Sequence, residues 1–276
     1  MLIHTETAYA KINLALHVRR RRIDGYHDLE TLFAFVDEGD KLTAHSTEQL
    51  SLSINGPFAK GLGKGDDNLI MQTAKLLQRR FAVEAGATIM LEKNLPVASG
   101  IGGGSADAAA TARILNSIWG INASNDELAS LLAPLGADIP ACVLSKTVFG
   151  SGTGTTLSPV IEGELKGMPV LLVNAMTAVA TRAVFQGWDG IDHGGLDRAS
   201  LIESAVKGRN DLQASAIAIS PGISNVLSAL QATRPIYSRM SGSGATCFAL
   251  YETIDARDAA RNEMDNDWWT LAGRLR

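Results

Sequence analysis

The sequence is poor in several residue types that mark particular classes of protein. Its 276 residues include only two cysteines, Cys142 and Cys247, and both stand among apolar neighbours. This pattern favours two buried free thiols in a reducing compartment over a disulfide or a metal-binding pair. Basic residues are not in surplus, since 25 Lys and Arg stand against 29 Asp and Glu. A nucleic-acid-binding chain usually shows the opposite balance, so we expect no nucleic-acid partner.

Long hydrophobic runs are also missing. The most apolar window, residues 168–180, is interrupted by Asn174 and Thr177 and is too short to span a bilayer. The first residues, Met-Leu-Ile-His-Thr-Glu-Thr, lack the charged-then-apolar pattern of a secretion signal. We therefore expect a cytoplasmic protein with no membrane partner. Hydrophobic residues make up 46% of the chain, which suits a globular core in one large domain or two small ones.

Glycine, by contrast, is common, and four of the 27 glycines fall in one stretch, residues 95–106, which reads Leu-Pro-Val-Ala-Ser-Gly-Ile-Gly-Gly-Gly-Ser-Ala. The alternating residues 87–93 before it predict a strand, and the alanine-rich residues 106–116 after it predict a helix closed by Gly120. The glycines remove every Cβ where the chain enters the helix. Backbone N–H groups there can approach an anion at the positive end of the helix dipole, so a phosphate chain is the expected ligand.

A plain tight turn before a helix is the alternative for this loop. The loop is not a Walker A motif, because no Gly-Lys-Ser/Thr follows, and it does not fit Gly-x-Gly-x-x-Gly, because residue 105 is serine. Without a loop lysine, a bound triphosphate depends on backbone N–H groups, the helix dipole and a divalent metal. Ser105 is the only hydroxyl at the helix entrance and is the candidate metal or phosphate contact.

Two other segments each contain a charged residue that is a candidate for binding or catalysis. Residues 7–18 predict a strand with Lys11 and Asn13 on one face, and that face either binds a ligand or is simply solvated. Asp138 stands between turn residues and a short apolar segment. It either caps the turn that follows or carries chemistry.

An arginine-rich turn follows the first strand. The four arginines at residues 19–22 favour a solvated hairpin tip over a nucleic-acid patch, because Asp24-Gly25 is a turn signal. Tyr26 and His27 come directly after this turn. They either pack against the protein or present a ring face and a hydrogen-bonding edge to a ligand.

The remaining segments predict a mixture of strands and helices that suits a two-layer α+β sandwich. A helix is predicted from residue 66 to 81, and a capping box at residues 124–127 predicts the start of another that runs from 126 to 133. The glycine-rich polar residues 149–156 predict a loop ahead of a boundary near residue 160. Further strands are expected at 31–35, 40–54, 169–174, 236–240, 245–251 and 268–275, and further helices at 196–207, 211–219, 223–232 and 256–266.

Three segments together resemble the GHMP kinases, the family of galactokinase, homoserine kinase, mevalonate kinase and phosphomevalonate kinase. They are Ala-Tyr-Ala-Lys-Ile-Asn-Leu-Ala-Leu from residue 8, the glycine-rich loop from residue 95, and Met-Ser-Gly-Ser-Gly-Ala-Thr-Cys-Phe from residue 240. Within the family, the segments Asp-Gly-Tyr-His-Asp from residue 24, Asp-Asn-Leu-Ile from residue 67 and Gly-Ala-Asp-Ile-Pro from residue 136 resemble the members that phosphorylate a diphosphocytidyl sugar alcohol.

The resemblance implies a two-domain α+β GHMP kinase fold. Residues 1–160 would form an N-terminal ATP-binding domain similar to ribosomal protein S5 domain 2. Residues 161–276 would form a ferredoxin-like C-terminal domain that contributes to substrate binding.

The resemblance also implies an ATP-dependent kinase of the non-mevalonate isoprenoid pathway, which phosphorylates the 2-hydroxyl of 4-diphosphocytidyl-2-C-methyl-D-erythritol. Asp138 would be the catalytic base and Lys11 its charge partner. Tyr26 and Phe185 would stack on the two faces of the cytosine and His27 would bond its edge, although Phe185 could instead be a core aromatic. The implied substrate-binding residues are Asn13, Tyr26, His27, Thr181 and Phe185. The implied ATP-binding residues are Asn68, Lys93, Pro96, Val97, Ala98, Ser99, Gly100, Ile101, Gly102, Gly103, Gly104, Ser105, Ala106, Ser241, Gly242, Ser243 and Gly244.

The loop departs from the common family pattern at two positions. A second consecutive serine is usual where this chain has Ala106, and Ala-Gly-Leu is usual where it has Ser99-Gly-Ile. With one hydroxyl fewer, we expect Mg²⁺ to be held mainly by ATP phosphates and water, with no protein metal ligand assigned. Two other functions stay open at this point, namely a kinase of the same family for another small alcohol and a nucleotide-binding regulator without catalysis.

Overall fold

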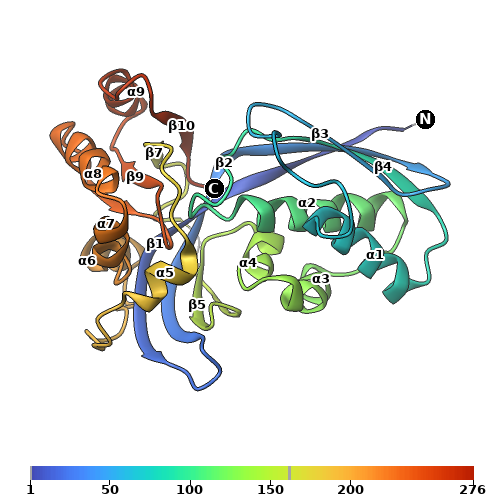
Figure 1. Cartoon of the computed structure of the whole chain (residues 1–276), viewed down its shortest axis with the longest axis horizontal. Helices are drawn as coiled ribbons and strands as arrows, with labels where there is room; N and C mark the ends of the chain where they lie inside the picture. Colours follow the sequence, from blue (N-terminus) through green and yellow to red (C-terminus); the bar gives the residue numbers. More distant parts are fainter. Residues whose placement is uncertain (1, 161–162) are drawn as a thin grey trace. The chain divides into compact units, whose positions relative to one another are not determined.

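The computed structural model describes residues 2–160 and 163–276, which fall into two compact units. The described part of unit 1 comprises residues 2–10, 39–97 and 102–145, and that of unit 2 comprises residues 11–38, 98–101, 146–160 and 163–276. Figure 1 shows the elements of both units along the chain. The second domain predicted from the sequence starts at residue 161, which lies outside the described residues, so the boundary near residue 160 stays a prediction.

Two long strands contribute residues to both units. β1 (His4–Arg21) and β2 (His27–Thr47) pair with each other, and β1 contains the strand predicted at residues 7–18. The separate strands predicted at 31–35 and 40–54 are wrong, because β2 runs on through Gly39 and ends at Thr47. A Cβ on Gly39 would lie 2.0 Å from the carbonyl oxygen of Ala8, so this glycine permits a close approach of two backbones instead of a turn.

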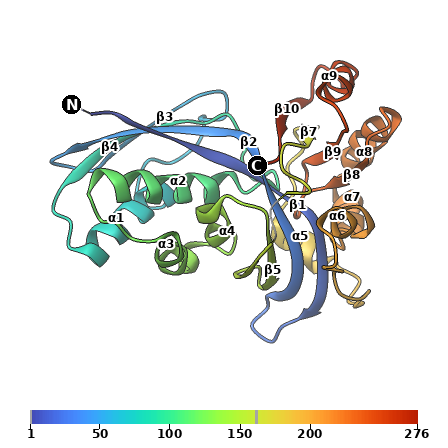
Figure 2. The same ribbon diagram turned by 180° about the vertical axis from the view of Figure 1, so that it is seen from behind.

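Unit 1 is built from a small sheet and a layer of helices. β4 (Gly86–Glu92) pairs in parallel with β3 (Ser51–Asn55) on one side and antiparallel with residues 41–47 of β2 on the other. Figures 1 and 2 show α2 lying along this sheet, with the other helices on its far side. The helices are α1 (Leu69–Phe81), α2 (Gly103–Ile118), α3 (Asn125–Leu132), the short 3₁₀ helix η1 (Ala133–Leu135) and α4 (Ile139–Leu144).

Local signals explain where two of these helices begin. The side chain of Asn68 accepts a hydrogen bond from the N–H of Ile70 at the start of α1. The side chain of Ser124 accepts one from the N–H of Glu127 at the start of α3, as the predicted capping box requires. Helix α4 was not predicted, because its six residues are too few to show a helical period.

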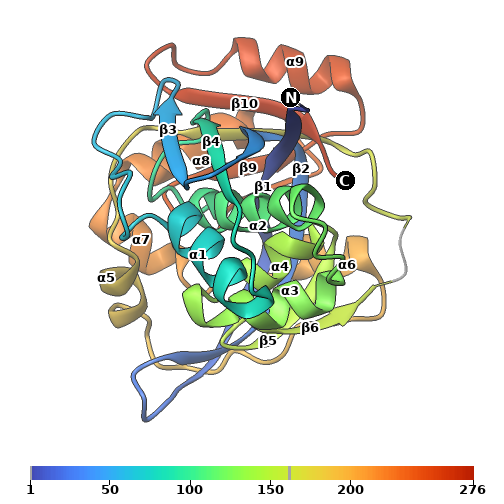
Figure 3. The same cartoon turned by 90° about the vertical axis from the view of Figure 1, so that its right-hand side faces the viewer.

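Unit 2 contains an antiparallel four-stranded sheet in the order β10-β7-β9-β8, and a hairpin of β5 and β6 that pairs with residues 29–33 of β2. Helices α8 and α9 pack against the four-stranded sheet, and Figure 3 shows α9 running beside β10. The strands are β5 (Val148–Gly152), β6 (Thr156–Pro159), β7 (Pro169–Asn174), β8 (Tyr237–Met240), β9 (Cys247–Leu250) and β10 (Trp269–Arg274). The helices are α5 (Thr181–Gln186), α6 (Leu201–Lys207), α7 (Gln213–Ile219), α8 (Gly222–Ala232) and α9 (Ile254–Asn262).

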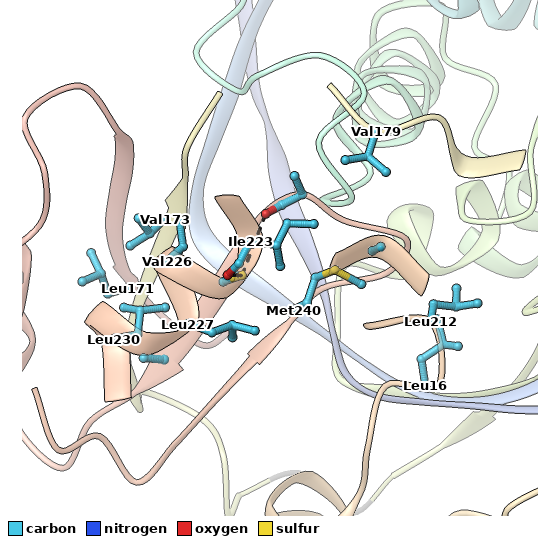
Figure 4. Packing of buried hydrophobic residues seen from close by; sticks show 14 of the residues in the cluster. Leu16, Leu171, Val173, Val179, Leu212, Ile223, Val226, Leu227, Leu230 and Met240 are labelled. Atoms are coloured by element: carbon cyan, nitrogen blue, oxygen red, sulfur yellow. Dashed lines mark hydrogen bonds between the residues drawn. The ribbon is translucent and has the colours of Figure 1, made fainter. Parts of the chain in front are cut away.

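The core of unit 2 includes a large cluster of buried apolar side chains. Figure 4 shows residues of β7 such as Leu171 and Val173 packed beside Val226 and Leu230 of α8. Cys247 belongs to this cluster, and both cysteines are free and buried, as the sequence predicts. Burial raises the pKa of the Cys247 thiol.

Three segments of unit 2 differ from the prediction. The glycine-rich residues 149–156, predicted as a loop, supply most of the β5–β6 hairpin. The helix predicted from residue 196 begins only at Leu201, because Ser200 caps it and the N–H of Leu196 is bonded to the carboxylate of Glu30. Helix α5 was not predicted. No helix in residues 2–160 or 163–276 has the length and apolar character needed to cross a membrane.

Candidate active site

In unit 1, the glycine-rich segment leads into a helix as predicted. β4 ends at Glu92 and α2 begins at Gly103, after an N-cap, Gly102, with a left-handed φ of 66°. Gly102 makes no side-chain cap hydrogen bond, so no N-cap side chain occupies the first N–H groups of this 16-residue helix. This is the arrangement that binds phosphate groups in proteins, because uncapped N–H groups and the helix dipole attract negative charge.

The candidate base lies on a segment that passes close to this helix start. A Cβ on Gly136 would lie 3.9 Å from Oγ of Ser105, the candidate phosphate or metal contact in the first turn of α2. Two residues later, Asp138 occupies the N-cap position of α4, but its side chain makes no cap hydrogen bond there. The structure therefore does not support a helix-capping role for Asp138, which is half-buried.

Lys93 forms a buried ionic cluster with two aspartates that no pattern in the sequence indicates. Its Nζ donates hydrogen bonds to Oδ2 of Asp40 and to Oδ2 of Asp107, both at 2.6 Å. The three side chains, called the Lys93 cluster below, are 3%, 0% and 7% exposed for Lys93, Asp40 and Asp107 respectively.

Burial and the neighbouring opposite charges shift the pKa values of Lys93 and Asp107 in opposite directions. Burial raises the pKa of Asp107 to about 8, despite the nearby ammonium group. Burial alone would lower the pKa of Lys93, but the carboxylates of Asp107 and Asp40 raise it, so the lysine stays charged. Lys93 donates to two aspartates in this structure, and its predicted contact with ATP stays a prediction.

In unit 2, the other part of the loop is bonded to the second glycine turn. Oγ of Ser241 donates to the carbonyl oxygen of Gly100 at 2.9 Å, and the N–H of Thr246 donates to the carbonyl oxygen of Ser99 at 3.1 Å. Gly100 has a φ of +81°, and a Cβ on it would lie 2.6 Å from the carbonyl oxygen of Ser241 and 2.7 Å from that of Gly244. Glycine is therefore required at position 100 by both backbone angle and space.

Lys11 and Asn13 of β1 lie beside these turns in unit 2. Nζ of Lys11 donates to Oδ1 of Asn13 at 2.9 Å, so the two share one face as the strand alternation predicts. The N–H of Asn13 donates to Oγ of Ser241 at 3.1 Å, and Nδ2 of Asn13 donates to Oγ1 of Thr31 at 2.8 Å. Thr31 was not predicted, because a lone threonine in a strand carries no signal of such a contact.

Thr181 and Ser243 extend this group of unit 2 contacts, with their hydroxyl oxygens 3.0 Å apart. Direct hydrogen bonds within one unit therefore connect residues 11–13, 99–101, 181 and 241–246. Lys11 belongs to unit 2 and Asp138 to unit 1, so their predicted partnership stays a prediction.

His27, which follows the arginine-rich turn in the sequence, forms an aromatic cluster with Phe185 and Trp188. The His27 ring lies 5.0 Å from the Phe185 ring, centroid to centroid, and 5.6 Å from the Trp188 ring in an edge-to-face arrangement. Trp188 was not predicted, since the sequence around it gives no helical or strand period. Tyr26 is 65% exposed. Burial and, to a smaller extent, Arg21 lower the pKa of His27, so its ring is neutral at pH 7.

Other predicted residues have local roles. Arg22 pairs with Asp24 and Asp28 at the exposed tip of the hairpin, consistent with a solvated turn. The side chain of Asn68 caps α1 and also donates to the carbonyl oxygen of Gly63. Pro96 is buried, whereas Val97 is 52% exposed. Within the described ranges, His, Cys, Asp and Glu side chains do not gather in groups of three or more that could hold a metal ion.

Comparison with known proteins places this geometry in a family. The GHMP kinases N terminal domain matches residues 68–146, and the GHMP kinases C terminal domain matches residues 195–270. The 4-diphosphocytidyl-2-C-methyl-D-erythritol kinase of Sphingopyxis alaskensis is 51% identical, over 98% of both chains. The kinase of the same name from Novosphingobium aromaticivorans is 52% identical, over 98% of this chain and 92% of that protein.

The same likeness extends to a solved structure. The crystal structure of a 4-(cytidine 5'-diphospho)-2C-methyl-D-erythritol kinase superposes with a TM-score of 0.82 and 30% identity, over 99% of each chain. These matches confirm the predicted two-domain GHMP kinase fold of mixed helices and strands. Because both family domains match and relatives above 50% identity cover almost its full length, the chain belongs to the GHMP kinases.

Proposed function

We propose that the chain transfers the γ-phosphoryl group of ATP to the 2-hydroxyl of 4-diphosphocytidyl-2-C-methyl-D-erythritol, a reaction of the non-mevalonate isoprenoid pathway. The observation that carries this proposal is the contact of His27 with Phe185, at 5.0 Å between ring centroids. It joins an aromatic ring and a neutral hydrogen-bonding ring, which are the groups needed to stack on a cytosine and bond its edge. The names of the relatives described above support the same substrate.

To transfer a phosphoryl group to an alcohol, the protein must mainly position the two reactants and stabilise the charge of the transition state. The hydroxyl oxygen forms a bond to the γ-phosphorus while the bond from that phosphorus to the β–γ bridging oxygen breaks, and ADP leaves. We assign Asp138 as the base that orients the hydroxyl and takes its proton late in the reaction. Lys11 would offset the negative charge that develops.

The proposed nucleotide site comprises the loop from Pro96 to Ala106, the turn from Ser241 to Gly244, and Asn68 and Lys93. The uncapped start of α2 and the half-buried hydroxyl of Ser105 suit a phosphate chain with its cation. Mg²⁺ keeps several waters and is often held through substrate phosphates, so this donor set fits it. When bound, it would neutralise charge on the transferred phosphoryl group.

The proposed acceptor site lies on residues of unit 2. Tyr26 would stack on the cytosine together with Phe185, His27 would bond the edge of the base, and Asn13 and Thr181 would contact the body of the substrate. Of the two domains predicted from the sequence, residues 1–160 would supply most of the nucleotide site, and residues 161–276 would contribute to substrate binding.

The decisive assay follows ADP release from Mg²⁺-ATP with the diphosphocytidyl substrate, alongside mevalonate, homoserine and no-acceptor controls. We expect ADP only with the diphosphocytidyl substrate. Release with another alcohol would keep the kinase activity and reject this acceptor. No release with any alcohol, together with measurable ATP binding, would indicate a regulator without catalysis.

Phe185 provides a specific test of the base-stacking site. We expect Phe185→Leu to raise the KM for the diphosphocytidyl substrate about 5- to 150-fold, because stacking contributes about 1–3 kcal/mol per base. Leucine keeps apolar contact with the core of unit 2, so the fold should persist. The KM for ATP, measured in the same preparation, should be unchanged. An unaltered KM for the acceptor would show that Phe185 is only a core side chain.

A further inference from the structure

The Lys93 cluster connects segments that lie on both sides of the glycine-rich loop. Asp40 comes from β2, Lys93 immediately follows β4, and Asp107 is the fifth residue of α2. The two aspartates are 53 and 14 positions from Lys93 in the sequence. All three side chains are almost completely buried, and all belong to unit 1.

Asp40 also holds the backbone where the loop begins. Its Oδ1 accepts hydrogen bonds from the N–H of Asn94 at 2.5 Å and from the N–H of Leu95 at 2.8 Å, while its Oδ2 bonds Lys93. A carboxylate with both oxygens engaged in this way sets the direction in which the chain leaves β4.

The other end of the loop rests on the same cluster. A Cβ on Gly103, the first residue of α2, would lie 3.1 Å from Nζ of Lys93 and 3.8 Å from Oδ2 of Asp40. The start of the helix therefore passes directly over the ammonium group. Asp107, one turn further on, ties the helix to that ammonium through a hydrogen bond of 2.6 Å.

A buried cluster of this kind is an expensive way to hold a fold together, because removing ionisable groups from water opposes folding and apolar residues of similar volume often serve as well. Its contacts are instead concentrated on the two ends of one loop. We propose that Asp40, Lys93 and Asp107 are positioning residues that hold both ends of the glycine-rich loop in the spacing that binds the phosphates of ATP.

This inference rests on the proposed function, and it gives Lys93 a role in holding the loop in addition to its predicted contact with ATP. If Lys93 acted only by touching the nucleotide, loss of either aspartate would leave ATP binding largely intact. If the cluster acts as one positioning unit, Asp40→Asn and Asp107→Asn should weaken ATP binding by disturbing the Lys93 cluster, in which both aspartates are buried.

The experiment measures the Kd of ATP by calorimetry without an acceptor, and then the KM for ATP and kcat at saturating ATP. The variants are Asp40→Asn, Asp107→Asn and Lys93→Met. Glu6→Gln is the matched control. Glu6 lies on β1, and its carboxylate pairs at 2.8 Å with Arg113, which lies on α2 as Asp107 does. Thermal unfolding of each variant identifies those that remain folded. Because Lys93→Met leaves two buried carboxylates without their partner, the double variant Lys93→Met/Asp107→Leu is prepared as well.

We expect each folded cluster variant to raise the Kd and KM for ATP at least tenfold, while kcat at saturating ATP and the KM for the acceptor change less than threefold. Glu6→Gln should bind ATP like the wild type. Wild-type ATP affinity in folded Asp40→Asn and Asp107→Asn variants would overturn the proposal. The binding measurement uses no acceptor, so it stays valid even if the wild type fails to phosphorylate the diphosphocytidyl substrate, which is the result that would reject the proposed function.

Discussion

Asp138→Asn should abolish turnover while ATP still binds. An amide has the shape of the carboxylate but cannot accept the proton of the attacking hydroxyl, and general base catalysis is worth about 10²–10⁴-fold in rate. We therefore expect kcat to fall by about that factor, with the Kd for ATP within a factor of two or three of the wild type. Because the Asp138 side chain makes no cap hydrogen bond on α4, the substitution should not unfold the helix.

Asp126→Asn is the matched control for this experiment. Asp126 is an exposed acidic residue in the first turn of α3, so the same chemical change there should leave kcat unaltered. Comparable activity of the Asp138→Asn variant and the control would remove Asp138 from the mechanism. Loss of ATP binding together with turnover would assign Asp138 to the nucleotide site and not to the base.

Gly100→Ala should be strongly destabilising and should impair the use of ATP. A Cβ at this position would lie 2.6 Å and 2.7 Å from two backbone carbonyl oxygens of the 241–244 turn, and the φ of +81° is itself unfavourable for alanine. Strain and overpacking together should lower the free energy of unfolding by about 2–5 kcal/mol. Denaturant unfolding and the KM for ATP measure the two effects.

Gly190→Ala separates these two causes. Gly190 has nearly the same backbone angle, with a φ of +80°, but a Cβ there would meet nothing within 4 Å. It should therefore show only the cost of the left-handed conformation, about 1–2 kcal/mol, with an unchanged KM for ATP. Equal losses of stability in the two variants would mean that the contact between residue 100 and the 241–244 turn is unimportant.

Elements with strong local signals could be predicted from the sequence. The alternating pattern placed Lys11 and Asn13 on one strand face, and Ser124 predicted the start of α3 through its capping box. Both signals depend on residues within four positions of one another. The strand, glycine loop and helix around residues 87–118 were predicted for the same reason.

Features that depend on distant partners could not be predicted. Gly39 looks like a turn residue, and only its approach to Ala8 explains why β2 continues through it. The pairing of Lys93 with Asp40 spans 53 positions, and neither periodicity nor composition indicates it. Trp188 was missed because its contact with His27 likewise arises from tertiary packing. The family resemblance therefore predicts the residues that meet the substrates, whereas the structure supplied the side chains that support those residues.

The burial of both cysteines has a practical consequence for spectroscopy. Cys142 and Cys247 are 1% and 0% exposed, and both lie in the interior of the folded chain. Thiol reagents act on accessible thiolates, so the natural cysteines should react slowly with maleimide dyes while the protein is folded. A cysteine introduced at one exposed position in each unit could then carry a fluorophore without removing either natural thiol. Energy transfer between the two dyes would report on the separation of the units as nucleotide and acceptor are added.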